Sequence, residues 1–203
     1  MRTAFWLNVA VKASLILLLA FGTFSGLERF AGKAFGWRLL GYSIAAFIVP
    51  AIWAARGRRS SYPYASDILF VLPFLIDTIG NALDLYDTID WWDDANHLVN
   101  WFLHTAAIGL LLRRTTLPAP ARAGIAVGWA ATTAILWELA EYVAFVPGSA
   151  EASTAYADTL GDLALGLLGG TIAAVASAWW PRDSLADDAA PADGAGPAVL
   201  PVS

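Results

Sequence analysis

Cysteine is absent from the 203 residues of this chain, methionine occurs once and histidine twice. The chain therefore forms no disulfide and offers neither a thiolate metal ligand nor a cysteine nucleophile. Charged residues are also scarce, at 14% against about 25% in soluble domains. Hydrophobic residues make up 58% of the chain and the mean hydropathy is +0.59. This composition indicates an integral membrane protein.

The sequence also lacks the short motifs of several enzyme classes. It has no phosphate-binding glycine loop, no dinucleotide fingerprint and no nucleophile elbow around a serine. We expect membrane lipids around the chain and no nucleic-acid partner.

Six apolar stretches are long enough to cross a bilayer, which takes roughly 20 residues of helix. We therefore predict an all-α integral membrane protein, a bundle of six transmembrane helices. The predicted spans are Ala4 to Leu27, Trp37 to Ala55, Ser66 to Leu85, Ala95 to Leu112, Ala121 to Val146 and Tyr156 to Trp180. Glycine and proline mark the connections between them.

Arginine placement predicts the orientation, because Lys and Arg in short loops stay on the cytoplasmic side. With the N-terminus inside, that side holds Arg2, Arg56, Arg58, Arg59, Arg113, Arg114, Arg122 and Arg182. The outer side holds only Arg29, Lys33 and Arg38. Both termini are then cytoplasmic, and we expect a multi-pass protein of the plasma (inner) membrane.

The end of the chain differs in composition from the rest. Residues 1–181 form the predicted six-helix domain. Residues 182–203 consist largely of Ala, Pro, Gly and Asp, with four aspartates. Such a segment buries too little apolar surface to fold, so it is predicted to be a disordered acidic cytoplasmic tail.

Acidic residues and histidines converge on the predicted outer ends of four helices. They lie at the end of the third span, the start of the fourth, the end of the fifth and the start of the sixth. The predicted site consists of Asp94, His97, Glu138, Glu141, Asp158 and Asp162. Ionisable groups within a membrane usually face the bundle interior and mark function.

Two further polar residues are predicted to lie deeper. Asp77, Asn81 and Asp84 share one face of the third span, and Asp77 lies roughly 15 Å below the following loop at 1.5 Å per residue. His104 lies at a similar depth on the fourth span. We predict that Asp77 and His104 pair at the bottom of a polar funnel.

A structural explanation exists for some of these acids. Asp93, Asp94 and Asp158 stand where acids commonly cap helices. Capping does not explain Asp77, Glu138 or Glu141, because the helix dipole disfavours negative charge near a helix C-terminus.

Three short motifs carry a family resemblance. They are an acid four residues before a histidine (Asp93 to His97), a Glu-x-x-Glu (Glu138 to Glu141), and Asp158 to Asp162 followed by a glycine-rich helix. In this order they resemble the YjdF-like family of bacterial inner-membrane proteins and, more distantly, the VanZ-like membrane proteins. The resemblance supports the fold and the site and implies no chemistry, since the YjdF-like family has no established activity.

Three functions remain open. Clustered carboxylates in a membrane need a cation or shared protons, and His97, Glu138, Glu141, Asp158 and Asp162 could ligate a divalent metal such as Mg, Mn, Zn or Fe. The leading hypothesis is a metal-dependent enzyme acting on a lipid or polyprenyl-linked substrate, with the three outer bases holding an anionic headgroup. The alternatives are a proton or cation transporter and a structural or accessory membrane protein.

Overall fold

The computed structural model describes residues 2–58, 60–145 and 150–180, so the predicted tail at 182–203 lies outside the described residues. Within these ranges the regular structure is entirely helical. The α-helices are α1 (Arg2–Phe24), α2 (Phe35–Ala46), α3 (Ile48–Ala55), α4 (Tyr64–Ala82), α5 (Leu85–Thr88), α6 (Trp92–Leu112), α7 (Ala119–Phe145) and α8 (Ala155–Trp179). Two 3₁₀ turns, η1 (Glu28–Phe30) and η2 (Ala150–Ser153), lie in the connections.

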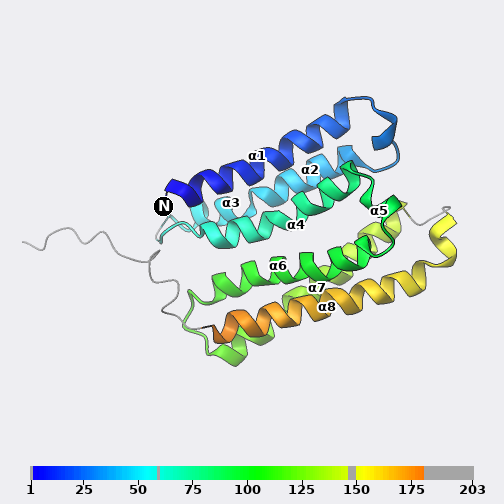
Figure 1. Ribbon diagram of the computed structural model, residues 1–203. Coiled ribbons are helices and arrows are strands. Elements are labelled where there is room, and N and C mark those ends of the chain that lie inside the picture. Colours follow the sequence, from blue (N-terminus) through cyan, green and yellow to red (C-terminus); the bar gives the residue numbers. More distant parts are fainter. Residues whose placement is uncertain (1, 59, 146–149, 181–203) are drawn as a thin grey trace, which may run out of the picture.

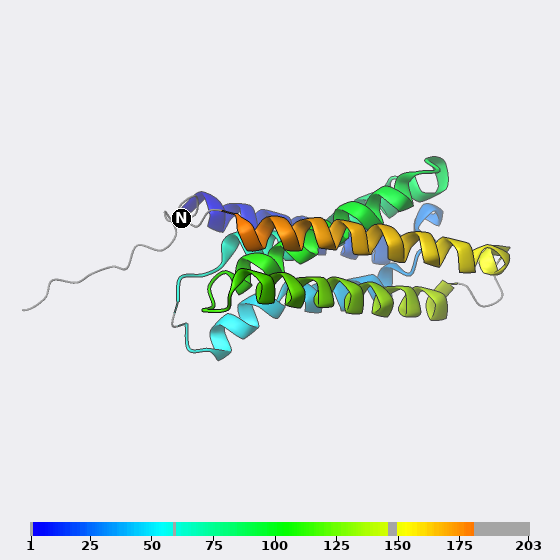
Figure 2. The same cartoon turned by 90° about the horizontal axis from the view of Figure 1, so that it is seen from below.

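The helices form an elongated bundle (Figures 1 and 2). One half consists of α1, α2, α3 and α4, the other of α6, α7 and α8, and α4 packs against α6 where the halves meet. The chain runs along the bundle six times, with α2 and α3 sharing one pass. The start of α1 and the end of α8 consequently lie at the same end (Figure 1).

The predicted spans match the observed helices to within a few residues at each end. The largest difference is in the second span, which is interrupted at Phe47. Pro50 explains the interruption, because it has no N–H to donate to the carbonyl four residues earlier. The short helix α5 was not predicted. Because α4 ends at Ala82, Asp84 does not extend the helical face of Asp77, which corrects that part of the prediction.

Five segments in the described residues are long and apolar enough to cross a membrane: Arg2–Phe24, Phe35–Ala55, Tyr64–Ala82, Ala119–Val143 and Ala155–Trp179. The remaining pass along the bundle is α6, the fourth in chain order, and it is also long, at 21 residues. Two asparagines, two histidines and two aspartates make it more polar than the others. Two of these polar residues, Asp93 and His97, belong to the candidate site described below.

Glycines allow α8 to pack closely against its neighbours. A Cβ on Gly169 would stand 3.0 Å from the carbonyl carbon of Leu98 on α6. Cβ atoms on Gly166 and Gly170 would overlap Trp101 on α6 and Ala130 on α7. The close-packing face expected of a glycine-rich membrane helix is present, and it holds α8 against the helix that carries both histidines.

A buried ion pair joins α1 to α4 near the opposite end of the bundle from the acidic clusters. The ammonium of Lys12 lies 2.5 Å from Oδ2 of Asp67, whose side chain is fully buried. Asn8 and Tyr62 also donate hydrogen bonds to this oxygen. Asp67 is not among the predicted site residues, and its burial makes the N-terminal half depend on a charge pair.

Candidate functional site

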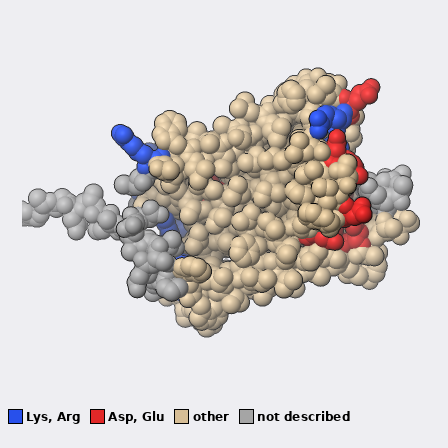
Figure 3. Space-filling model, in the orientation of Figure 1, with Lys and Arg blue, Asp and Glu red and all other residues tan. Residues whose placement is uncertain are grey.

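The acidic side chains gather at one end of the bundle. Figure 3 shows Asp and Glu concentrated there beside a group of Lys and Arg, with further Lys and Arg at the opposite end. The acidic end contains the C-terminal end of α4, helix α5, the start of α6, the end of α7 and the start of α8 (Figure 1). The predicted convergence of acids from four helices is thus observed.

A cavity of about 690 Å³ lies at this end between the two halves. Six carboxylates and two bases line it: Asp77, Asp87, Asp93, Glu138, Glu141 and Asp158, with Lys33 and Arg38. Aromatic side chains form part of its wall, among them Phe74, Trp101 and Trp137. The excess of acids means that the cavity attracts cations.

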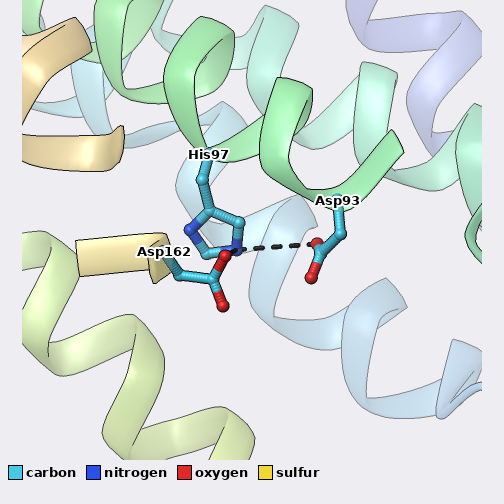
Figure 4. Close-up of side chains that lie close together, drawn as sticks. All are labelled: Asp93, His97 and Asp162. Carbon is cyan, nitrogen blue, oxygen red and sulfur yellow. Dashed lines mark ion pairs between the residues drawn. The ribbon is translucent and has the colours of Figure 1, made fainter. Parts of the chain in front are cut away.

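His97 lies at the centre of a carboxylate cluster. Its Nε2 is 3.6 Å from Asp93 Oδ1, one helical turn earlier on α6, and 3.8 Å from Asp162 Oδ1 on α8. On the other side of the ring, Nδ1 is 3.7 Å from Glu138 Oε1 on α7. Figure 4 shows the carboxylates of Asp93 and Asp162 approaching the same nitrogen of the imidazole. Three helices therefore bring carboxylates to one buried ring.

Glu141 completes the cluster on the Nδ1 side. One donor atom from each of His97, Glu138 and Glu141 lies within 4.8 Å of the others, and the same holds for Asp93, His97 and Asp162. The side chain of His97 is 7% exposed, and its buried Nδ1 has no hydrogen-bond partner. A buried polar atom without a partner costs free energy, so this nitrogen is available to a ligand.

Two residues of the predicted site, Asp94 and Asp158, are exposed and lie outside the cluster around His97. Asp94 is exposed at the start of α6, and Asp93 occupies the place beside His97 that was predicted for Asp94. Asp158 is exposed at the rim of the cavity, outside both groups of clustered ligands. The spacing of four residues from Asp93 to His97 is the signal that distinguishes the two aspartates.

The capping explanation does not fit these acids either. The N-cap residues of α6 and α8 are Trp91 and Thr154, and neither helix has a side-chain capping hydrogen bond. Asp93, Asp94 and Asp158 lie within the first turns, where the helix dipole still favours them.

Asp77 has partners other than the predicted His104. It forms an ion pair with Arg38 on α2, and Tyr42 and Tyr86 donate hydrogen bonds of 2.7 and 2.9 Å to its carboxylate. Asn81 donates another, of 3.1 Å. No local pattern in the sequence indicates Arg38 as the partner, because the two residues are 39 positions apart on different helices.

His104 lies instead in an aromatic environment. The rings of Phe70, Phe74, Trp101 and Trp129 have centroids 4.3 to 5.9 Å from its own. Its buried Nε2 has no hydrogen-bond partner and the residue lines the cavity. The predicted Asp77–His104 pair is therefore corrected to an Arg38–Asp77 pair and a separate histidine.

The outer bases are engaged with acids of the protein. Lys33 lies 2.5 Å from Asp84 and 2.8 Å from Asp87, and Arg29 lies 3.7 Å from Asp84. Burial lowers the pKa of Lys33, but the hydrogen bonds and charges of Asp84 and Asp87 raise it overall. The hydrogen bond from Lys33 lowers the pKa of Asp84. With Arg38 paired to Asp77, these three bases form ion pairs within the protein, which weakens their predicted role in holding an anionic headgroup.

The chain belongs to the family described as "Predicted membrane protein (DUF2238)", whose sequence profile matches residues 10–183. The YjdF-like proteins that the three motifs resemble are this family. No match to VanZ-like proteins accompanies it, so the more distant resemblance is without support. No curated protein and no solved structure matches the chain.

Proposed function

We propose that this member of the DUF2238 family binds a divalent cation at His97 and that the cation serves a membrane enzyme. The observation that carries the proposal is the unpartnered, buried Nδ1 of His97 beside the carboxylates of Glu138 and Glu141. An acidic cluster alone would be weaker support, because carboxylates also gather on solvated surfaces.

The spacing of the donor atoms suits a small cation. Ligand bonds of about 2.0–2.2 Å hold neighbouring donors about 3 to 3.5 Å apart. His97 Nδ1 and Glu138 Oε1 are 3.7 Å apart, so a small side-chain rotation brings both to bonding distance. With Nδ1 bound to the cation, Nε2 carries the proton and faces Asp93 and Asp162, which would orient the ring.

Charge compensation supports the same assignment. A divalent cation offsets part of the excess of acids that line the cavity. Oxygen donors with one imidazole suit Mg, Mn, Zn or Fe. Such a cation polarises a phosphoryl oxygen or activates a water molecule, and Asp158 at the rim would lie near an incoming substrate.

For the topology we propose six spans in the plasma (inner) membrane: the five apolar segments and, in addition, α6. The cytoplasmic bias of arginine places both termini inside and the cavity at the outer leaflet. A reporter fused after Ser203 that works only outside the cytoplasm should be inactive. Activity of that fusion would place the cavity on the cytoplasmic side.

Elemental analysis of the purified full-length protein tests the cation centre. We expect one or two divalent cations per chain in the wild type and a clear loss in Glu138→Gln, which keeps the shape and one acceptor oxygen. Asp94→Asn is the matched control, because Asp94 is an exposed acid three residues before His97. A wild-type protein without metal after incubation with Mg, Mn, Zn and Fe would contradict the proposal.

The enzyme is tested separately on two phosphorylated amphiphiles, a short-chain phosphatidic acid and a short polyprenyl diphosphate. We expect metal-dependent release of phosphate from one of them, lost in Glu138→Gln. A protein that holds metal and releases phosphate from neither would retain the cation centre but not this reaction.

A proton or cation transporter is the second candidate, supported by the Lys12–Asp67 pair. This pair adds a buried acid near the opposite end of α4 from Asp77, and Oδ1 of Asp67 has no hydrogen-bond partner. The cavity does not reach Asp67 among the described residues, so a path would need a second conformation. Proton or metal flux into vesicles carrying the protein, abolished by Asp67→Asn, would favour transport over the enzyme.

A further inference from the structure

We infer that the substrate of this site is a membrane lipid that enters the cavity sideways, between α2 and α7. The inference rests on the proposed function for what happens at His97, but the route of entry follows from the walls of the cavity. A cavity of about 690 Å³ is far larger than a bound cation needs, and falls in the range of pockets that hold small molecules.

The wall formed by α7 is open to the outside of the bundle. Leu136 and Tyr142 line the cavity, yet they are 58% and 55% exposed. Ala140, on the same stretch of α7, lines the cavity and is also exposed. A residue both lines a cavity and stands exposed where the cavity opens, so these three residues form the rim of a side opening.

This opening faces lipid. Leu136 lies nine residues before the end of α7 at Phe145, about 13 Å along the helix. The neighbouring side chains of Ile135, Leu139 and Val143 are large, apolar and exposed, as expected of a bilayer-facing surface. A water-soluble substrate would have to cross this apolar layer to use the side opening, whereas a lipid already lies in it.

The opposite edge of the opening is formed by α2. The aromatic ring of Tyr42 stacks on that of Trp137 at 6.2 Å between centroids, so the two helices meet there. Arg38, one turn earlier on α2, lines the cavity towards the outer end. The side opening thus extends from the Tyr42–Trp137 contact towards the outer end of the bundle.

The interior has the two chemistries that an amphiphile requires. Glu138, buried beside His97, is flanked in sequence by the rim residues Leu136 and Ala140, so the polar cluster begins next to the opening. Phe74 and Trp101 supply an apolar wall further in. A lipid can therefore place its polar group at His97 while its hydrocarbon chain remains in the bilayer.

Photo-crosslinking of the full-length protein tests this route. The protein is placed in vesicles of phosphatidylethanolamine and phosphatidylglycerol that contain a phosphatidylglycerol with a diazirine near the head of one acyl chain. After irradiation, mass spectrometry locates the adducts. We expect adducts on Trp101 inside the cavity as well as on bilayer-facing residues such as Val143. Adducts confined to the bilayer-facing residues would overturn the inference.

Two matched variants test the opening itself. Ala140→Trp fills the rim and should reduce adducts on Trp101 at least fivefold. Leu139→Trp adds an indole to the preceding residue of α7, which does not line the cavity, and should leave those adducts unchanged. Adducts on Trp101 at the wild-type level in Ala140→Trp would show that lipid enters elsewhere. Leu136→Trp, at the same rim, provides a second obstruction if Ala140→Trp does not fold.

Metal content measured on the same samples separates this inference from the proposed function. Adducts on Trp101 in a protein that holds no metal would leave the side opening in place and remove the cation centre. A metal-containing protein without adducts inside the cavity would retain the cation centre and remove the side opening.

Discussion

The guanidinium of Arg38 on α2 forms an ion pair with the carboxylate of Asp77 on α4, and both residues line the acidic cavity. Both side chains are largely buried, at 13% and 9% exposure. Hydrogen bonds from Tyr42, Tyr86 and Asn81 occupy the remaining acceptor positions of the carboxylate. Asp77 therefore joins α2, α4 and α5 at the wall of the cavity, and we assign it a structural role.

Asp77→Asn should destabilise the protein much more than Asp87→Asn. Removing one partner of a buried ion pair leaves the other charge uncompensated, at a cost of about 3–5 kcal/mol. Asp87 has a side chain that is 65% exposed, so water replaces its contact with Lys33. In detergent we expect a fall in Tm of roughly 6–20 °C for Asp77→Asn and little change for Asp87→Asn.

A double variant distinguishes the lost ion pair from a general intolerance at this position. Asp77→Leu combined with Arg38→Met removes both charges, and should recover much of the stability lost in Asp77→Asn. Equal and small effects of Asp77→Asn and Asp87→Asn would show that the Arg38 pair contributes nothing measurable.

The ion pair of Lys33 with Asp84 predicts a pH dependence. Because the folded state lowers the pKa of Asp84, its contribution to stability is complete above the unfolded pKa of about 3.9 and is lost as pH falls through the folded value. Asp84→Asn should lower Tm by roughly 1–3 °C at neutral pH. Asparagine is the appropriate substitute, because Asp84 has a φ of 57° and Asn tolerates this conformation.

The Tm difference between wild type and Asp84→Asn should then shrink as the pH is lowered below about 4. A difference that stays constant from pH 7 to pH 3 would mean that the charge of Asp84 is not what stabilises the connection.

The close packing of α8 through its glycines should affect both the stability of the protein and the metal content of the site. Gly169→Ala should destabilise the protein by about 1–3 kcal/mol, because the new Cβ meets the backbone of Leu98, which cannot move aside without shifting α6. Separating α6 from α8 should also draw Asp162 away from His97 and reduce bound metal. Gly161→Ala is the control, since nothing lies within 4 Å of its added Cβ. Equal Tm values for the two variants would contradict the close contact.

The sequence predicted the helices well because each has a local signal. Apolar length, prolines and glycines are read from neighbouring residues, and the helix boundaries follow. The convergence of acids at one end was also predictable, since alternating passes bring the end of one helix beside the start of the next. Glu138, Asp162 and His97 were correctly selected as neighbours on this argument alone.

Side-chain pairing across helices was not predictable in the same way. Asp77 and His104 have similar calculated depths, but depth does not determine which way a residue faces around its helix. Arg38 is the partner of Asp77 because α2 packs against α4, and no local pattern in the sequence contains that information. Asp67 lies in the first turn of α4, where the helix dipole favours an acid whether or not it has a partner, so no local pattern indicates its pairing with Lys12.

The choice between Asp93 and Asp94 is the sharpest test of the cation site. Asp93 lies one helical turn before His97 and within 3.6 Å of its Nε2, while Asp94 is exposed on the outside of α6. Asp93→Asn should lower the affinity for the metal about 10- to 100-fold, as expected when a carboxylate that orients a ligand histidine is lost. Asp94→Asn removes the same charge from the next residue and should leave the affinity within about twofold, because a solvated charge is screened. Titration of metal-free protein with Mn²⁺ measures both affinities. Equal losses in the two variants would mean that the acids act only through their summed charge, and His97 would then have no oriented partner on α6.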